Sequence, residues 1–292
     1  MSDQSIYLDH AATTPIDPVV AEQMAQALHL ANPASAHSAG RLAAEQVEQA
    51  RATVAGHVGA ASEQLIWTSG ATEADNLALR GVMAGQPGRK LLIGATEHPA
   101  VRECAEALQR EGVPMERIPA GRDGLLDLAW LDGRLGVGDV ALVSVMLANN
   151  ETGVIQDIPA IAKQVHAAGA WLHCDAVQAA GKLPLVWNDL GVDLLSLSSH
   201  KLYGPKGVGA LVLGERVVLH RHMHGGGQEA GLRGGTENVP AIAGFGAAAV
   251  LAADELATRI ATLQQLREQL DAGLDQIPGV TRFAAAAPRL CN

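Results

Sequence analysis

Short apolar runs alternate with longer stretches of helical periodicity along most of the chain, and this alternation limits the possible folds more than any other feature. Several of the runs are apolar throughout, as is typical of strands covered on both faces. Strands that alternate with helices form a mostly parallel sheet flanked by helices. We therefore predict an α/β fold. Its expected strands are Leu65–Thr68, Leu91–Gly94, Met115–Ile118, Ala141–Leu147, Ala170–Cys174, Leu194–Ser198 and Gly209–Leu213.

Helical patterns fill the segments between these runs. The segment Ala100–Glu111 begins after Pro99 and ends at Gly112, which are typical start and stop residues. The other expected helices are Ala43–Val58, Ile158–Ala168 and an alanine-rich stretch from Pro240 to about Leu274. This order predicts an N-terminal arm (1–15), a large domain (16–258) and the start of a small C-terminal domain (259–292) that is not completed.

The charge balance of the 292 residues is acidic, with 21 Lys and Arg against 31 Asp and Glu, a formal net charge of −10. Such a chain offers no basic field for nucleic acid or an anionic membrane. The three cysteines, an odd number, argue against a disulfide framework and for a reducing compartment. Met1–Gln4 lacks the pattern of a secretory signal, and we find no apolar run of about 18 residues that would span a membrane. We therefore expect a cytoplasmic protein.

Ligands of parallel α/β sheets bind at the carboxyl ends of the strands, so the residues that follow each run are the candidate site. After Leu65–Thr68, Ala71 and Thr72 open a helix, where free backbone N–H groups and a hydroxyl can bind a phosphate. By itself, that turn is more simply an ordinary helix cap. After Leu91–Gly94, His98 can stack on a flat ligand or transfer a proton, although a lone loop histidine is more often structural.

Three further polar residues follow the next two strands. The Asn150 amide can donate to a phenolate or a carboxylate, although asparagine is also a common turn residue. Asp175 comes directly after an apolar strand, where an unpaired carboxylate is costly to bury, so it either caps a helix or holds a cation. Gln178 lies in the same turn as Asp175.

Lys201 is the most informative residue of the chain, because it follows the buried strand Leu194–Ser198. Burial lowers the pKa of an ammonium group, and a neutral amine can form a Schiff base. Ser198 and His200 beside it can donate to a phosphate. For a lysine taken at random, an exposed loop position is the more common finding.

These weak signals converge on one ligand if the strands are parallel. Pyridoxal phosphate requires an amine for its aldehyde, a carboxylate for its ring nitrogen, donors for its phosphate and amides for its phenolic oxygen. A single ligand that needs all of these partners together is pyridoxal phosphate. A metal ion is not expected, because the alternating histidines at 220, 222 and 224 have weak ligand spacing.

Seven motifs, in their order and spacing, resemble those of the group I cysteine desulfurases. That family consists of class V, fold-type I pyridoxal phosphate enzymes of iron–sulfur cluster assembly. The resemblance extends from about residue 6 to the end of the chain. The motifs are Tyr7–Pro15, Asn32–Ser35, Thr68–Glu73, Thr96–His98, Asn149–Gly153, Ser199–Lys201 and His224–Glu229.

The resemblance implies roles for the matching positions. Lys201 forms the Schiff base with the cofactor, Asp175 pairs with the pyridine nitrogen, and His98 stacks on the ring and moves protons. Thr236 reaches the phosphate of a neighbouring subunit, which implies a homodimer. The implied reaction converts L-cysteine to L-alanine and passes the sulfur on as a persulfide, with a sulfur-acceptor or scaffold protein as a further partner. The remaining implied cofactor contacts are the phosphate ligands Ala71 (through its backbone), Thr72, Ser198 and His200, and the phenolic-oxygen ligands Asn150 and Gln178.

The sequence departs from the family pattern in one respect. The family's Ser-Gly-Ser-Ala-Cys loop, which carries its nucleophile, and its substrate-binding arginine do not occur in this chain. Cys104 and Cys174 are expected to be buried, and Cys291 is expected to be exposed by its position. Three functions therefore stay open: a desulfurase that is inactive as this fragment, a class V aminotransferase or lyase without persulfide chemistry, and a non-catalytic dimerising homologue.

Overall fold

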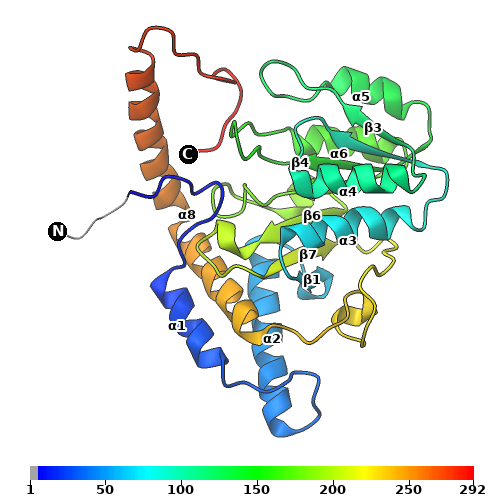
Figure 1. Ribbon diagram of the computed structural model, residues 1–292, viewed down its shortest axis with the longest axis vertical. Coiled ribbons are helices and arrows are strands. Elements are labelled where there is room, and N and C mark those ends of the chain that lie inside the picture. Colours follow the sequence, from blue (N-terminus) through cyan, green and yellow to red (C-terminus); the bar gives the residue numbers. More distant parts are fainter. Residues whose placement is uncertain (1–5) are drawn as a thin grey trace.

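A seven-stranded sheet forms the centre of the computed structural model, which describes residues 6–292 (Figure 1). The prediction that the chain has no secretory signal rests on residues 1–4, which lie outside the described residues. The strands are β1 (Leu65–Thr68), β2 (Lys90–Gly94), β3 (Met115–Ile118), β4 (Val140–Met146), β5 (Trp171–Asp175), β6 (Leu194–Ser198) and β7 (Gly209–Leu213).

The order of the strands is β1-β7-β6-β5-β4-β2-β3. The neighbours from β3 to β6 pair in parallel, whereas β7 is antiparallel to both β1 and β6. The predicted α/β fold with a mostly parallel sheet is therefore confirmed. Each predicted strand is found, with ends that agree to within one residue. β5 ends at Asp175 and not at Cys174, because the Asp175 carbonyl still accepts from the Leu147 N–H at 2.9 Å.

Helices cover both faces of the sheet (Figure 1). α3 and α4 pack together on one face, and residues of α2, α5, α6 and α8 contribute to the core on the other. The α-helices are α1 (Pro18–Ala27), α2 (Ser38–His57), α3 (Ala71–Met83), α4 (Pro99–Arg110), α5 (Leu128–Leu135), α6 (Ile158–Ala167), α7 (Trp187–Leu190) and α8 (Val239–Leu274). Three short 3₁₀ turns are η1 (Ser62–Gln64), η2 (Ser199–Lys201) and η3 (Glu229–Gly231).

Local sequence signals explain where the helices begin and end. α4, α6 and α8 each have a proline in the first turn, where its missing N–H is not needed. The side chains of Asp157 and Asn238 accept from free N–H groups at the starts of α6 and α8. After α4 and α6, the chain turns at Gly112 (φ 98°) and Gly169 (φ 67°), a left-handed conformation that favours glycine.

α8 is the longest helix, with 36 residues, and it runs without a break through position 258. The division into a large and a small domain at that position stays a prediction. Among the described residues, α8 alone is long and apolar enough to cross a membrane. However, 56% of its most apolar window is buried inside the fold, and its first half packs against α1 and α2. It is a core helix in this structure.

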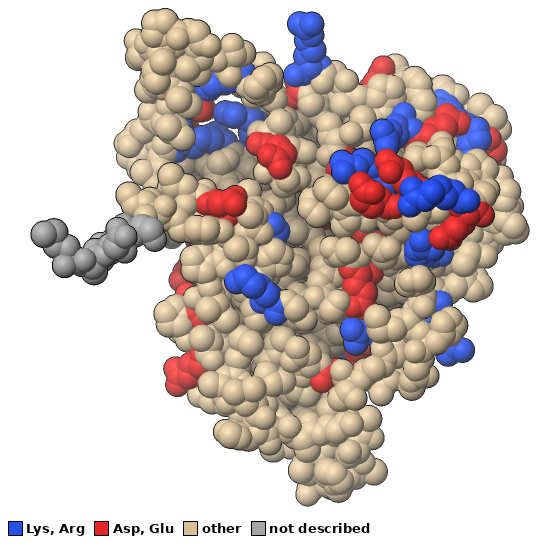
Figure 2. All heavy atoms as spheres, in the orientation of Figure 1, with Lys and Arg blue, Asp and Glu red and all other residues tan. Residues whose placement is uncertain are grey.

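Charged side chains of both signs lie side by side over the region of α4 and β3 on the face seen in Figure 2. Ion pairs link Lys90 and Arg134 to Glu116, and Arg117 to Glu106. Because opposite charges are interleaved there, this region presents no field of one sign.

Candidate active site

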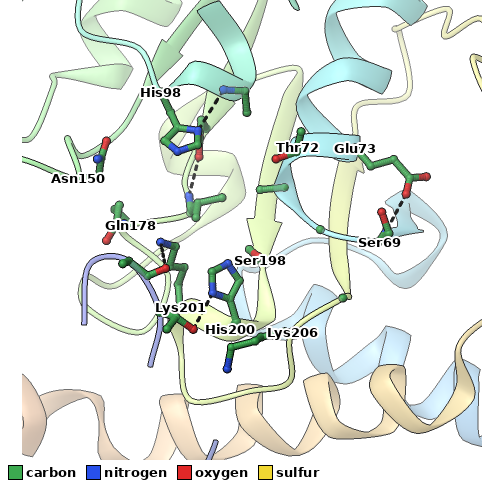
Figure 3. A pocket seen from close by; sticks show the side chains of 18 of the residues that line it. Ser69, Thr72, Glu73, His98, Asn150, Gln178, Ser198, His200, Lys201 and Lys206 are labelled. Carbon is green, nitrogen blue, oxygen red and sulfur yellow. Dashed lines mark hydrogen bonds between the residues drawn. The ribbon is translucent and has the colours of Figure 1, made fainter. Parts of the chain in front are cut away.

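The carboxyl ends of the central strands and the first turn of α3 surround a cavity of about 440 Å³ (Figure 3). Every predicted site residue except Thr236 lines it. These residues come from five separate parts of the chain, as expected for a parallel sheet. They are Ala71, Thr72, His98, Asn150, Asp175, Gln178, Ser198, His200 and Lys201.

The first turn of α3 points its free backbone N–H groups toward the cavity. The helix begins after Gly70, and no side chain caps it. Gly70 has φ 152° and ψ 175°, a combination that is essentially restricted to glycine. A Cβ atom at Gly209 would lie 2.7 Å from the Gly70 backbone, so two glycines allow β7 to approach this turn closely. A helix N-terminus with free N–H groups is a binding site for an anion such as a phosphate.

Lys201 lies in η2, directly after β6, and its amine enters the cavity. Nζ donates to the carbonyl oxygens of Ala11 and Ala12, at 2.8 Å in the second case. Burial lowers the pKa of Lys201, and the carboxylates of Asp175 and Asp9 oppose that shift. A lowered pKa makes the neutral, nucleophilic amine more accessible at neutral pH.

Asp175 is the last residue of β5 and is 5% exposed. Its Oδ1 accepts from the Val177 N–H at 3.0 Å. Burial raises the pKa of Asp175 to about 6, so at neutral pH the group is still mostly a carboxylate. β5 and β6 are adjacent in the sheet, and this adjacency brings Asp175 and Lys201 to the same cavity.

Two histidines complete the wall of the cavity. His98 precedes α4, and its Nδ1 accepts from the Ala100 N–H at 3.1 Å, so the proton of the neutral ring lies on Nε2. Burial, followed by the charges of Lys201 and Arg102, lowers the pKa of His98. His200 lies 3.1 Å from the Thr13 hydroxyl, and burial with the nearby Lys201 lowers its pKa to about 4. Both rings are therefore neutral at neutral pH.

The two predicted amides have different surroundings. Gln178 is 5% exposed, and its Nε2 donates to the Ala11 carbonyl at 2.8 Å. Asn150 is only partly buried, and its Nδ2 donates to the Glu151 carboxylate at 2.8 Å. Both side chains lie at the edge of the cavity (Figure 3).

Two lining residues, Thr13 and Lys206, were not predicted as site residues from the sequence. The signal for Lys206 was its place in the same loop as Lys201. Thr236 is exposed and lies outside the cavity, so its role toward a neighbouring subunit stays a prediction.

The three cysteines are all buried. For Cys104 and Cys174 this agrees with the prediction. For Cys291 the expected exposure is wrong: it is 6% exposed, because Leu290 beside it packs into the core and donates its N–H to the Gly153 carbonyl at 2.9 Å. Burial raises the pKa of all three thiols, to about 11 for Cys104. Between residues 6 and 292, no three His, Cys, Asp or Glu side chains form a group that could hold a metal ion.

Comparison with known proteins gives the family. The model of the class V aminotransferases matches residues 6–291. The chain belongs to the class V aminotransferase family. A relative named cysteine desulfurase IscS, from Anaeromyxobacter sp. (strain Fw109-5), is 49% identical over 281 residues, which are 92% of this chain and 69% of the relative. A cysteine desulfurase from Rhodobacter capsulatus is 44% identical over 298 residues, covering 100% of this chain and 77% of the relative.

Solved structures of NifS-like proteins and of a cysteine desulfurase share this fold. A NifS-like protein from Rickettsia africae ESF-5 superposes with a TM-score of 0.92 at 36% identity, covering 98% of this chain and 79% of that chain. A structure described as SspA in complex with cysteine has a TM-score of 0.81 at 34% identity, covering 84% of this chain and 72% of that chain. The fold is that of the fold-type I cysteine desulfurases.

Members of this family use pyridoxal phosphate, and the donor set of the cavity fits that group. The cavity holds an amine (Lys201), a buried carboxylate (Asp175) and an uncapped helix N-terminus with hydroxyl groups nearby. These match, in order, the aldehyde, the basic ring nitrogen and the phosphate of the cofactor.

Proposed function

We propose that this chain catalyses the pyridoxal phosphate-dependent removal of sulfur from L-cysteine, which leaves L-alanine. The observation that carries the proposal is that Lys201 and Asp175 line one cavity from the ends of two adjacent strands. The names of the relatives, and the cysteine bound to a structural neighbour, support this choice of substrate.

The residues that would hold the cofactor follow from the donor set. Asp175 would pair with the ring nitrogen, His98 would lie against the ring, and Lys201 would bind the aldehyde. The phosphate would be held by the Ala71 N–H, Thr72, Ser198 and His200, and the phenolic oxygen by Asn150 and Gln178. Thr236 would reach the phosphate in a second copy of the chain, which makes the proposed enzyme a homodimer.

When bound, pyridoxal phosphate supplies an aldehyde that takes up the amino group of the substrate and a ring that accepts electrons. The chain supplies the proton chemistry around it. The Lys201 amine, with its lowered pKa, can remove and return a proton at the substrate α-carbon. His98 can donate from Nε2, because its Nδ1 already accepts from the backbone. The Asp175 carboxylate favours the protonated, electron-accepting ring.

The sulfur step requires a thiol acceptor. The C–S bond of cysteine breaks, an S–S bond forms with the acceptor sulfur, and the carbon takes up a proton, so that cysteine plus a thiol gives alanine plus a persulfide. Cys104, Cys174 and Cys291 are buried with raised pKa values, so none of them offers a ready thiolate. The acceptor in this proposal is a thiol supplied from outside these three residues.

The test is to incubate the purified chain with pyridoxal phosphate, L-cysteine and an added low-molecular-weight thiol. Alanine and reducible sulfur should appear in equal amounts, and Lys201→Ala should abolish both together with the visible cofactor absorbance. A Lys201→Ala protein that keeps the same absorbance and a borohydride-reducible imine would show that a different lysine binds the cofactor.

The burial of all three thiols favours one alternative, a class V aminotransferase or lyase without persulfide chemistry. That enzyme would turn over an amino acid without releasing sulfide. A chain that binds the cofactor and turns over no amino acid would instead be a non-catalytic dimerising homologue.

We propose a bacterial cytoplasmic setting and a role in iron–sulfur cluster assembly, in line with the IscS relatives.

A further inference from the structure

A second buried lysine has no role in the proposed reaction and lines a neighbouring cavity that shares Gln178 and Lys201 with the first. Lys182 is 7% exposed and lies in the turn that follows β5. Its Nζ donates to Gln178 Oε1 at 2.7 Å. In residues 6–292 no carboxylate lies within 4.0 Å of this amine, so the Gln178 amide is the polar partner that the structure gives it. A buried ammonium without a carboxylate is costly to keep and indicates a specific use.

The turn itself holds the two side chains together. The N–H groups of Ala180 and Leu183 donate to the carbonyls of Ala176 and Ala179, so the backbone follows a helical path here. On such a path, side chains four positions apart lie on the same side. Residues 178 and 182 have this spacing.

The chemistry of the partners fixes which way the Gln178 amide faces. An ammonium group can only donate, so the atom that faces Lys182 must be the amide oxygen. On its other side, Gln178 faces the Ala11 carbonyl, which can only accept, so the atom there must be the nitrogen. The orientation of a glutamine amide is often ambiguous, but here a donor and an acceptor determine it from both ends.

An amide in this orientation presents N–H and not oxygen to the ligand. The Nε2 atom has two hydrogens, and one of them is directed to Ala11. Gln178 lines the cavity next to Asp175 and Lys201, so its nitrogen is the part of the amide available to an oxygen anion there. The positive charge on Lys182 also polarises the amide toward stronger donation.

We propose that Lys182 is a positioning residue that holds the Gln178 amide with its N–H side toward the cofactor's phenolic oxygen. This inference rests on the proposed function, because it assumes that pyridoxal phosphate binds at Lys201. Lys182 acts through Gln178 and does not itself touch the cofactor. It therefore sets the affinity for the cofactor and the ionisation of its phenolic oxygen.

The test is a double-mutant cycle that measures the dissociation constant of pyridoxal phosphate. The full chain is freed of cofactor and titrated with pyridoxal phosphate, and the visible absorbance is followed. Lys182→Met and Gln178→Met should each weaken binding about tenfold, the usual effect of losing one charge-assisted hydrogen bond. The double variant should bind no more weakly than Gln178→Met alone. Lys182→Arg, which keeps a group that only donates, should bind within about twofold of the unmodified chain.

The remaining outcomes of this experiment overturn either the role of Lys182 or the proposed function. Unchanged binding in folded Lys182→Met, or independent effects that multiply in the double variant, overturns the proposal, because Lys182 then does not act through Gln178. If Lys182→Met does not fold, Lys182→Gln replaces it, since a second amide accepts as well as donates and no longer fixes the orientation. An unmodified chain without any Lys201-dependent absorbance overturns the proposed function itself, and this outcome is seen before any Lys182 variant is made.

Discussion

The amine of Lys201 donates to the carbonyl oxygen of Ala12 at 2.8 Å, although 189 positions separate the two residues. The N-terminal segment is held in this position by Thr14, which is 2% exposed. The Thr14 hydroxyl donates to the His200 carbonyl at 2.9 Å and accepts from the Tyr203 N–H at 2.7 Å. One buried hydroxyl thus connects the N-terminal segment to the chain on both sides of Lys201.

We predict that Thr14→Val lowers the free energy of unfolding by about 1–3 kcal/mol, because the partly buried Tyr203 N–H loses its acceptor and the His200 carbonyl keeps the Thr14 N–H but loses the hydroxyl. Urea denaturation measures the change. Thr53→Val is the matched control: the Thr53 hydroxyl bonds only the carbonyl one helical turn earlier, on an exposed surface, so a change below about 0.5 kcal/mol is expected. Equal effects of the two substitutions would contradict the connecting role of Thr14.

Asp175→Ala should weaken the retention of pyridoxal phosphate by about tenfold to a hundredfold, because the ring nitrogen loses its charged partner. It should also abolish amino acid turnover, since the ring is then a poorer electron acceptor. Equilibrium dialysis and alanine formation measure the two effects. Turnover that is unchanged in the variant would refute the role of Asp175.

Gly209→Ala tests the close approach of β7 to the first turn of α3. The added Cβ would lie 2.7 Å from the Gly70 backbone and from the Leu197 carbonyl, so the backbone must shift. We expect a loss of about 1–3 kcal/mol in stability and weaker binding of inorganic phosphate. Gly133→Ala in α5 is the control, because a Cβ there meets nothing within 4 Å, and helical alanine should stabilise by about 0.5–1 kcal/mol. Phosphate binding that stays unchanged in Gly209→Ala would remove the basis for assigning the anion site to this turn.

His173 should make stability depend on pH. It is fully buried between the hydroxyls of Ser144 and Ser196, and burial lowers its pKa from 6.5 to about 3. The unfolded chain therefore binds the proton more readily than the folded chain at any pH between these values. The stability that this group contributes is complete above pH 6.5 and is lost as the pH falls toward 3, by up to about 1.4 kcal/mol per pH unit.

The comparison with His173→Gln reports the contribution of His173 together with that of the Asp75 carboxyl, whose Oδ1 lies 3.5 Å from His173 Nε2, because the more distant titrating groups are common to both proteins. At neutral pH the variant should be less stable than the unmodified chain. As the pH is lowered below 6.5, the difference in the free energy of unfolding should shrink. A difference that does not change with pH would mean that His173 is not held neutral by the fold.

A mixed-dimer experiment tests Thr236. If this residue serves the site of a second copy, Lys201→Ala chains and Thr236→Val chains should each be impaired alone. Mixed dimers of the two place both defects in one site and leave the other site intact, so mixing should restore activity. A protein that binds its cofactor as a monomer, measured by light scattering, would contradict the shared site.

The sequence predicted the strands well because most of them are short, largely apolar runs; Met115–Ile118 is the exception, with two charged residues at its centre. It also placed the site residues at the strand ends, since a parallel sheet brings those ends to one edge. It did not predict the antiparallel direction of β7, because strand direction depends on how the following chain returns and leaves no mark in the apolar pattern of Gly209–Leu213.

Contacts between residues that are far apart in the sequence could not be predicted either. The hydrogen bonds from Gln178 and Lys201 to Ala11 join segments whose proximity no local pattern encodes. The burial of Cys291 likewise depends on the pairing of its neighbours with residues 153 and 154. Lys182 showed no signal in the sequence, because only the folded turn reveals that its side chain is buried against Gln178.

Ser198 and Gly209 pair with each other in the sheet, and the loop that carries Lys201 starts after the first and finishes before the second. Both ends of that loop are thus anchored at a single point of the rigid framework. The N-terminal segment lies over the amine and is joined by hydrogen bonds to that loop and to Gln178. The reactive nitrogen is therefore fixed from two directions, by the sheet below it and by the segment above it.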